Sequence, residues 1–331
     1  MNDPIDWLLK ELASDISTKS EEELANIELE LKKHVKIKEN PGAPFSPELE
    51  STLKISPEEA TDRGFVFDTF MDLANKWGRK RRLRSYEIKK EKYPERTKIV
   101  AEGDSWFQYP LLLKDIIDQL SGSYNILCLS AAGAELQHMF KEDEFFEAIE
   151  KERPSFFLLS GGGNDLLGDS FKLFLDDYTP GIPGQEPERF LKDNFEGFLE
   201  TIGVYYQSIF KRAKKYHDDF GLQVLVHGYD FIIPYEKSKR GGWVGKYMEK
   251  KKIEDQLDKQ ALIDYILKRF HTVLSSLVDS FSYVHFVHTQ GTLPVDRNYW
   301  ADEIHPTDEG FRLVAQKFSK KIQALSTPPI P

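Results

Sequence analysis

The stretch Lys98-Ile99-Val100-Ala101-Glu102-Gly103-Asp104-Ser105 is the part of the sequence on which the interpretation of the fold depends. Residues 99–101 have the composition of a short buried β-strand, and a Gly-Asp-Ser turn follows at once. Open α/β sheets place their chemistry at the carboxyl ends of strands, which makes Ser105 a candidate nucleophile. Gly, Asp and Ser are also ordinary turn residues, so the motif alone favours a plain turn, and the rest of the chain has to decide.

The composition is that of a globular protein with a sizeable core. The chain has 331 residues, of which 40% are hydrophobic and 13% aromatic, which suits one or two domains. Its net charge of -10 argues against general nucleic-acid binding, so we expect no specific nucleic-acid partner. The one cysteine, Cys128, excludes a disulfide within the chain. No apolar run reaches membrane-spanning length and residues 1–12 lack a signal-peptide pattern, so we expect a cytoplasmic protein that does not span a membrane.

Residues 1–95 form a charged region that we expect to be helical and distinct from a second domain at residues 96–331. Apolar residues at helical spacing predict helices over 5–9 and 21–35, and a third helix from Pro57 onward. A break is expected at residues 41–46, which are rich in proline. We find no motif of chemical specificity in this region.

The charge of the chain inverts over residues 76–98, which hold eleven basic residues and three acidic ones. One interpretation is a patch for an anionic partner or a lipid headgroup. The other is a solvated helix face whose charges pair with the acidic remainder of the chain, and the sequence favours this second interpretation without excluding the first.

From residue 98 onward, short apolar segments alternate with helical patterns. This alternation predicts a three-layer α/β/α domain with a mostly parallel, five-stranded, flavodoxin-like sheet. The expected strands cover residues 99–101, 125–129, 156–159, 223–226 and 283–288. The expected helices cover residues 111–120, 135–150, 187–220, 253–278 and 307–325.

Four short motifs lie at the same predicted end of this sheet. They are Gly103-Asp104-Ser105, the loop glycine Gly133, Gly162-Gly163-Asn164-Asp165 and Asp302-Glu303-Ile304-His305. In their order and spacing they resemble the SGNH hydrolase superfamily, the GDSL-type esterases and lipases, over roughly residues 96–325. The chain departs from the usual pattern of that family at Trp106, where a smaller aliphatic residue is common, so the resemblance leaves the substrate class open.

The chemistry of ester hydrolysis explains why these residue types occur together. A serine hydroxyl attacks an ester only when a base takes its proton, and His305 is the candidate base for Ser105. Asp302 lies three residues earlier on the same loop, where a carboxylate can hold the imidazole in one tautomer and stabilise the imidazolium. We therefore predict that Ser105, Asp302 and His305 are the catalytic residues.

The negative charge that develops on the substrate oxygen needs hydrogen-bond donors. We predict an oxyanion hole made of the backbone N–H of Ser105, the N–H of Gly133 and the side-chain amide of Asn164. A glycine lets the substrate approach its N–H, and a neutral amide donates without changing its protonation state. Asp104 and Asp165 are expected to support the turns through hydrogen bonds.

These motifs predict hydrolysis of carboxylic esters through an acyl-serine intermediate, with no metal and no organic cofactor. The expected substrates are short acyl or acetyl esters, or lysophospholipid-type lipids, with loops 176–187 and 229–247 as candidate lids. One alternative is a metal-dependent phosphoesterase, although we find no Asp-x-His on an early strand to bind the metals. The other is a non-catalytic scaffold that carries a helical interaction module.

Overall fold

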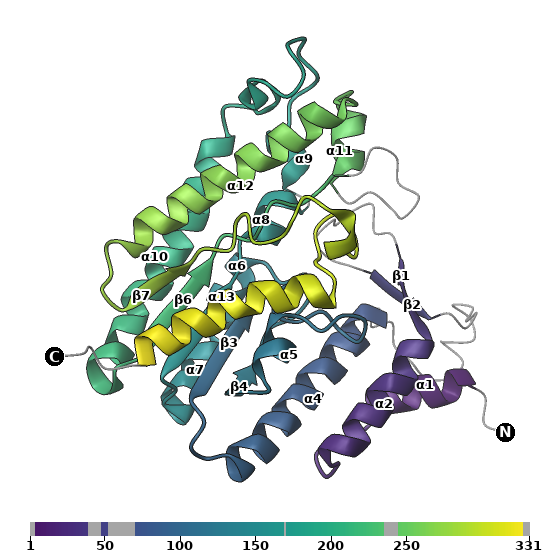
Figure 1. Cartoon of the computed structure of the whole chain (residues 1–331), viewed down its shortest axis with the longest axis vertical. Helices are drawn as coiled ribbons and strands as arrows, with labels where there is room; N and C mark the ends of the chain where they lie inside the picture. Colours follow the sequence, from purple (N-terminus) through teal and green to yellow (C-terminus); the bar gives the residue numbers. More distant parts are fainter. Residues whose placement is uncertain (1–3, 39–47, 52–69, 169, 235–243, 327–331) are drawn as a thin grey trace.

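The computed structural model describes residues 4–38, 48–51, 70–168, 170–234 and 244–326 (Figure 1). A five-stranded parallel sheet forms the centre, with the strands in the order β4-β3-β5-β6-β7. This order is flavodoxin-like and confirms the predicted architecture. The strands are β3 (Lys98–Gly103), β4 (Asn125–Cys128), β5 (Phe156–Ser160), β6 (Gln223–His227) and β7 (Val284–Val287).

Helices cover both faces of the sheet, which gives three layers (Figure 1). One face carries α4 (Phe70–Lys92), α5 (Ile116–Leu120) and α13 (Asp308–Ser326). The other carries α6 (Leu136–Glu142), α7 (Glu144–Glu152), α10 (Phe195–Phe220) and α12 (Gln256–Val278). Because both faces are covered, β4 and β5 are buried at every position, which explains why all their residues except Asn125 and Ser160 are apolar.

Two of the expected helices are shorter or divided because single residues take left-handed backbone angles. The helix expected at residues 111–120 begins only at Ile116, since Leu111 has a φ of 68° and Asp115 caps the N–H groups of Ile117 and Asp118. The helix expected at residues 135–150 is split into α6 and α7 at Asp143, whose φ is 64°.

Two further helix starts also differ from the expected positions. The segment expected as one helix over 187–220 is a short 3₁₀ turn, η1 (Pro187–Phe190), followed by α10. Leu191 between them is extended and pairs with Leu175. Helix α12 begins three residues later than expected because Asp255 accepts hydrogen bonds from the first N–H groups of the helix.

The N-terminal region is not wholly helical. It holds α1 (Pro4–Ala13), α2 (Glu21–Lys33) and an unexpected antiparallel pair, β1 (Val35–Lys38) and β2 (Glu48–Ser51). The break expected at residues 41–46 and the helix start at Pro57 lie outside the described residues. A second hydrophobic core joins this region to the sheet domain, and it contains Leu12, Leu31, Val35, Ala74, Trp77, Leu111 and Ala132.

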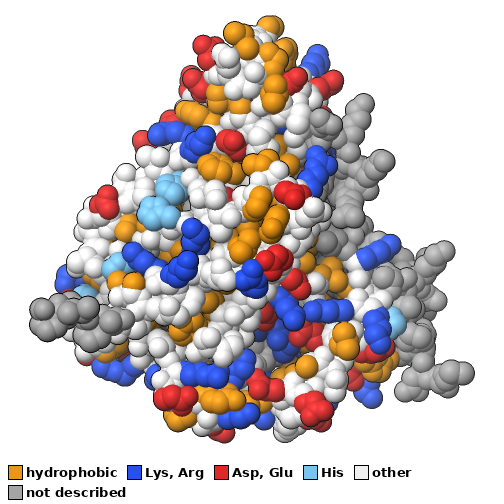
Figure 2. Space-filling model, in the orientation of Figure 1, with side chains coloured by type: hydrophobic (Ala, Val, Ile, Leu, Met, Phe, Trp, Pro, Cys, Tyr) orange, Lys and Arg blue, Asp and Glu red, His pale blue; other side chains and the backbone are white. Residues whose placement is uncertain are grey.

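The charges of the basic run at residues 76–98 are largely matched within the chain. Arg79 pairs with Glu144, Lys90 pairs with Glu152, and Arg82 pairs with the buried Asp115 of the sheet domain. Figure 2 shows basic and acidic side chains interleaved over the lower part of the visible face. This is the pattern expected of a face that is neutralised inside the chain. Separately, no helix among the described residues is long and apolar enough to cross a membrane.

Strand β3 contains a buried acid, Glu102, directly before the Gly-Asp-Ser turn. Its side chain is 7% exposed and accepts a hydrogen bond from the N–H of Gly103 at 2.8 Å. Burial raises the pKa of Glu102 to about 8, although the Gly103 N–H and the charge of Arg79 both oppose the shift. Near neutral pH the folded protein therefore holds a proton that the unfolded chain has lost.

We predict that Glu102→Gln flattens the dependence of stability on pH. In the wild type the free energy of unfolding falls as pH rises from the ordinary glutamate range to about 8, because the folded state binds more protons there. Urea unfolding at pH 5 and pH 8 measures the difference. Glu152→Gln is the control, since the pKa of Glu152 is lowered by Lys90 and Tyr86 against its burial, so this variant should lose stability at both pH values. Equal slopes in wild type and Glu102→Gln would contradict the prediction.

Candidate active site

The structure brings Ser105, His305 and Asp302 together at the carboxyl end of the sheet. The Oγ of Ser105 lies 2.7 Å from Nε2 of His305, and Nδ1 of His305 lies 2.8 Å from Oδ2 of Asp302. Ser105 and His305 are 200 positions apart in sequence, so only the fold can create this contact. Both side chains are 0% exposed and Asp302 is 3% exposed. A hydroxyl, an imidazole and a carboxylate thus form one buried chain of hydrogen bonds.

The loop of Asp302 shapes the position of His305 by local hydrogen bonds. Oδ1 of Asp302 accepts the N–H groups of Ile304 at 2.8 Å and His305 at 2.7 Å, which leaves Oδ2 for the imidazole. An ionised carboxylate only accepts hydrogen bonds, so Nδ1 of His305 carries the proton and Nε2 is left to accept the Ser105 proton. This is the tautomer in which an imidazole can act as a base.

Trp106 connects the serine turn to the histidine loop. Its indole Nε1 donates to the backbone oxygen of Ile304 at 3.1 Å. The ring is fully buried and packs edge-on against Tyr229, Trp300 and Phe311. Trp106 therefore lies in the core, where it connects the two segments that supply Ser105 and His305.

Three neighbouring segments hold the predicted oxyanion donors. The loop at residues 130–134 starts beside β3, since the N–H of Ala131 donates to the oxygen of Gly103 at 3.0 Å. It ends beside α8 (Gly163–Leu167), since Nδ2 of Asn164 donates to the oxygen of Ala134 at 2.8 Å. Gly133, between these two contacts, has a φ of 83°, which a residue with a side chain adopts only with strain.

Each predicted donor retains an N–H for a further acceptor. Within the described residues, neither the N–H of Ser105 nor that of Gly133 donates a hydrogen bond. Nδ2 of Asn164 carries two hydrogens, and the contact with Ala134 uses one of them. The arrangement can therefore accommodate a developing negative charge next to the Ser105 hydroxyl.

A buried network around Asp104 holds the turn that carries Ser105. Oδ1 of Asp104 accepts the N–H of Trp106 and the hydroxyl of Ser160, each at 3.0 Å, and Oδ2 accepts the hydroxyl of Tyr229. Nε2 of His227 lies 2.9 Å from Oγ of Ser160. Burial lowers the pKa of His227 to about 3, so this histidine is neutral and serves the network. The roles of Ser160 and Tyr229 were not predicted from the sequence, although Ser160 ends β5 and Tyr229 lies two residues after β6.

Asp165 supports the neighbouring turn. Its Oδ2 accepts the N–H of Leu136 at 2.9 Å, at the first residue of α6. Burial raises the pKa of Asp165 to about 6, with the charge of Glu135 adding to the shift. The contact joins α8, which carries Asn164, to the helix that follows the Gly133 loop.

Of the two candidate lids, loop 176–187 is anchored to helices of the sheet domain. The N–H of Gly184 donates to Oδ1 of Asp258 on α12 at 2.8 Å, and the N–H of Tyr178 donates to the oxygen of Lys251 at 2.8 Å. Lys251 follows α11 (Gly245–Lys250). In loop 229–247, residues 235–243 lie outside the described residues. Its role as a lid stays a prediction, as does that of loop 176–187.

Tyr109 faces the imidazole of the candidate base. Its ring is edge-on to that of His305 with a centroid separation of 4.7 Å, and the side chain is 1% exposed. Among the described residues its hydroxyl has no hydrogen-bond partner. Burial, and then the charge of Asp302, raise the pKa of Tyr109 well above its ordinary value. Tyr109 is therefore a neutral phenol with an unused hydroxyl next to the candidate base.

The described residues offer no cluster for a metal ion. No group of three or more His, Cys, Asp or Glu side chains in this part of the chain has the geometry to hold one.

No family model and no curated protein matches the sequence. The structure is similar to that of a protein assigned as a GDSL-like lipase from Parabacteroides merdae, with 13% identity, 68% of this chain and 94% of that chain covered, and a TM-score of 0.44. It is also similar to a protein assigned as an SGNH hydrolase from Slackia heliotrinireducens, with 14% identity, coverages of 69% and 99%, and a TM-score of 0.43.

A further similar structure is Axe2, an acetylxylan esterase from Geobacillus stearothermophilus. Here the identity is 13%, the coverages are 68% and 94%, and the TM-score is 0.40. Likenesses at these identities and TM-scores carry no weight for the chemistry, which rests on the geometry of the site.

We predict that Tyr109→Phe keeps or raises the free energy of unfolding. A buried polar group without a partner costs about 1–3 kcal/mol, and phenylalanine removes that group while keeping the ring. Tyr206→Phe is the matched control, because the buried Tyr206 hydroxyl donates to the oxygen of Gly161 at 2.9 Å and its loss should destabilise the protein. Urea unfolding of both variants measures the effect. A loss in Tyr109→Phe as large as that in Tyr206→Phe would show that the Tyr109 hydroxyl has a partner.

Proposed function

We propose that this protein is a serine hydrolase that cleaves carboxylic esters through an acyl-serine intermediate. The observation that carries the proposal is the buried chain from the Ser105 hydroxyl through His305 to Asp302, with contacts of 2.7 and 2.8 Å. A nucleophile in contact with a base, and a base oriented by a third group, is the geometry that such catalysis requires.

The reaction proceeds in two halves. Nε2 of His305 takes the Ser105 proton while Oγ attacks the ester carbonyl, and the imidazolium then gives that proton to the departing alcohol. In the second half a water molecule gives a proton to His305 and attacks the acyl-serine, and the proton returns to Oγ as the acid leaves. Asp302 keeps Nδ1 protonated in the neutral state and stabilises the positive charge of the imidazolium.

The oxygen of the attacked carbonyl becomes negative in both halves of the reaction. We assign its stabilisation to the N–H groups of Ser105 and Gly133 and to the amide of Asn164. The contact from Asn164 to Ala134 supports this assignment, because it holds the amide beside the Gly133 loop before any substrate arrives. Donors that are already in place need no reorganisation as the charge develops.

Short acyl or acetyl esters are the substrates that the enclosed site suits best. Ser105 and His305 have no exposed surface, and the rings of Trp106 and Tyr109 are buried around them. A small acyl group requires less opening of this site than the long chain of a lysophospholipid-type lipid does. A panel of p-nitrophenyl esters with increasing acyl length distinguishes the two classes.

We predict that Ser105→Ala abolishes ester turnover and labelling by a fluorophosphonate probe while the protein stays folded. The reason is that the hydroxyl is the attacking group, and its removal leaves a small change of volume in the core. Ser121→Ala is the control, because Ser121 is a partly buried serine outside the segments of the site, and its hydroxyl donates to the oxygen of Asp118 at 2.9 Å. Turnover and labelling retained in Ser105→Ala would contradict the proposal.

We predict that Asn164→Ala lowers kcat by roughly 10²–10³-fold with a smaller effect on KM, as expected for loss of an oxyanion donor. Asn125→Ala is the matched control, since Asn125 is a buried asparagine whose Nδ2 donates to the oxygen of Tyr93 at 2.8 Å. Steady-state kinetics on one ester compares the variants. A kcat for Asn164→Ala equal to that of Asn125→Ala would show that Asn164 only supports its turn.

A further inference from the structure

Helix α4 reaches the Gly133 loop through the side chain of Asn75. Nδ2 of Asn75 donates to the backbone oxygen of Ala132 at 3.2 Å, and Oδ1 accepts the backbone N–H of Ala132 at 3.2 Å. One amide group thus satisfies both backbone groups of the residue directly before Gly133. Asn75 and Ala132 are 57 positions apart, so this is a tertiary contact.

The same turn of α4 also contacts the segment that follows Ser105. Nε2 of Gln108 donates to the backbone oxygen of Asn75 at 3.2 Å. A Cβ atom at Gly78 would lie 3.2 Å from that Nε2, so a glycine leaves the most room for this contact. Asn75 therefore lies between the two loops that supply the Ser105 and Gly133 N–H groups.

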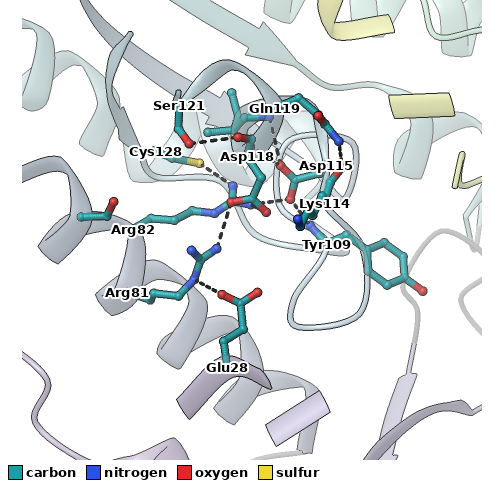
Figure 3. Close-up of polar contacts among 12 residues, drawn as sticks. Glu28, Arg81, Arg82, Tyr109, Lys114, Asp115, Asp118, Gln119, Ser121 and Cys128 are labelled. Carbon is teal, nitrogen blue, oxygen red and sulfur yellow. Dashed lines mark hydrogen bonds and ion pairs between the residues drawn. The ribbon is translucent and has the colours of Figure 1, made fainter. Parts of the chain in front are cut away.

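Arg82, two turns further along α4, also holds the segment that follows Ser105, and Figure 3 shows its contact with Asp115. Its guanidinium donates to the backbone oxygen of Phe107 and pairs with Asp115, and Oδ2 of Asp115 also accepts the N–H of Tyr109 at 2.8 Å. Arg82 is 6% exposed and Asp115 is fully buried. A charge-assisted contact at such a site holds backbone firmly because water does not compete for it.

Helix α4 is itself held by ion pairs to α2 and α5. Arg81 pairs with Asp118 of α5 at 3.0 Å and with Glu28 of α2 at 3.4 Å (Figure 3). The helix is therefore bound on one side to α2 and on the other to the loops of the candidate site.

We propose that Asn75 is a positioning residue for the oxyanion hole, with α4 as the rigid element that carries it. The proposal rests on the proposed function. Gly133 has wide backbone freedom and no side chain of its own with which to hold its N–H in place. The two hydrogen bonds between Asn75 and Ala132 supply that restraint. Asn75 therefore acts on the reaction through Gly133 and does not touch the substrate. A displacement of about 1 Å in such a donor can reduce the rate about 10²-fold.

The first test is the kinetics of Asn75→Ala. We expect kcat on a p-nitrophenyl ester to fall roughly 10- to 100-fold while KM changes little, because the lost restraint affects the transition state most. Glu87→Ala is the matched control on the same helix, since it removes only an ion pair with Arg84 that is 3.7 Å long. A kcat for Asn75→Ala within about twofold of that for Glu87→Ala would overturn the proposal.

A double-mutant cycle with Asn164→Ala shows whether Asn75 acts through the oxyanion hole. Residues that serve one catalytic unit are strongly non-additive. We therefore expect Asn75→Ala to cost much less in the Asn164→Ala background than in the wild type. Full additivity would assign the loss to some other cause and would overturn the proposal.

Amide hydrogen exchange over residues 129–136 measures the restraint without any need for activity. Exchange in this segment should be faster in Asn75→Ala than in Glu87→Ala, with the core strands unchanged. Unchanged exchange in the segment, or faster exchange throughout the protein, would overturn the positioning role. If the wild type neither turns over esters nor reacts with a fluorophosphonate, the proposed function fails, and the exchange result still decides whether Asn75 holds the loop.

Discussion

The carboxylate of Asp104 is the constraint on which the candidate site depends. It is fully buried, and it accepts hydrogen bonds from the Ser160 hydroxyl at the end of β5 and from the Tyr229 hydroxyl just beyond β6. The third group that donates to the Asp104 carboxylate is the N–H of Trp106, in the turn that carries Ser105. Because a buried carboxylate is costly unless its oxygens are satisfied, these contacts hold three strand ends in one arrangement. The position of Ser105 follows from that arrangement.

The second feature that shapes the site is the N-terminal region. Trp77 and Ala74 of α4 share a hydrophobic core with Leu111 and Ala132, which belong to the loops near Ser105 and Gly133. Polar contacts from α4 run to the same loops. The boundary expected at residue 95 therefore lies just after α4, a helix that packs on the sheet domain. Through this packing the N-terminal region, which contains no predicted catalytic group, affects the geometry of the site.

The sequence predicted the sheet better than it predicted the helices. All five strands occur within one or two residues of their expected positions, because apolar segments buried on both faces give a strong local pattern. The helix at residues 135–150 was expected to be continuous, yet it breaks at Asp143, which adopts a left-handed angle that no local pattern indicated. The antiparallel pair of β1 and β2 was missed because each strand has only four residues, and because the helix expected over 21–35, which ends at Lys33, included Val35 of β1.

By itself, the sequence determined the order of strands and helices and the residue types at the strand ends. Those types were enough to single out Ser105, Asp302 and His305, because each lies in a short motif next to a predicted element. Only the tertiary structure decided that the Ser105 hydroxyl meets an imidazole 200 positions away, and that Asn75 contacts Ala132. Such contacts join segments that are distant along the chain, and no local periodicity or turn preference encodes them. They arise when the parallel sheet brings its strand ends to one edge and α4 packs beside them.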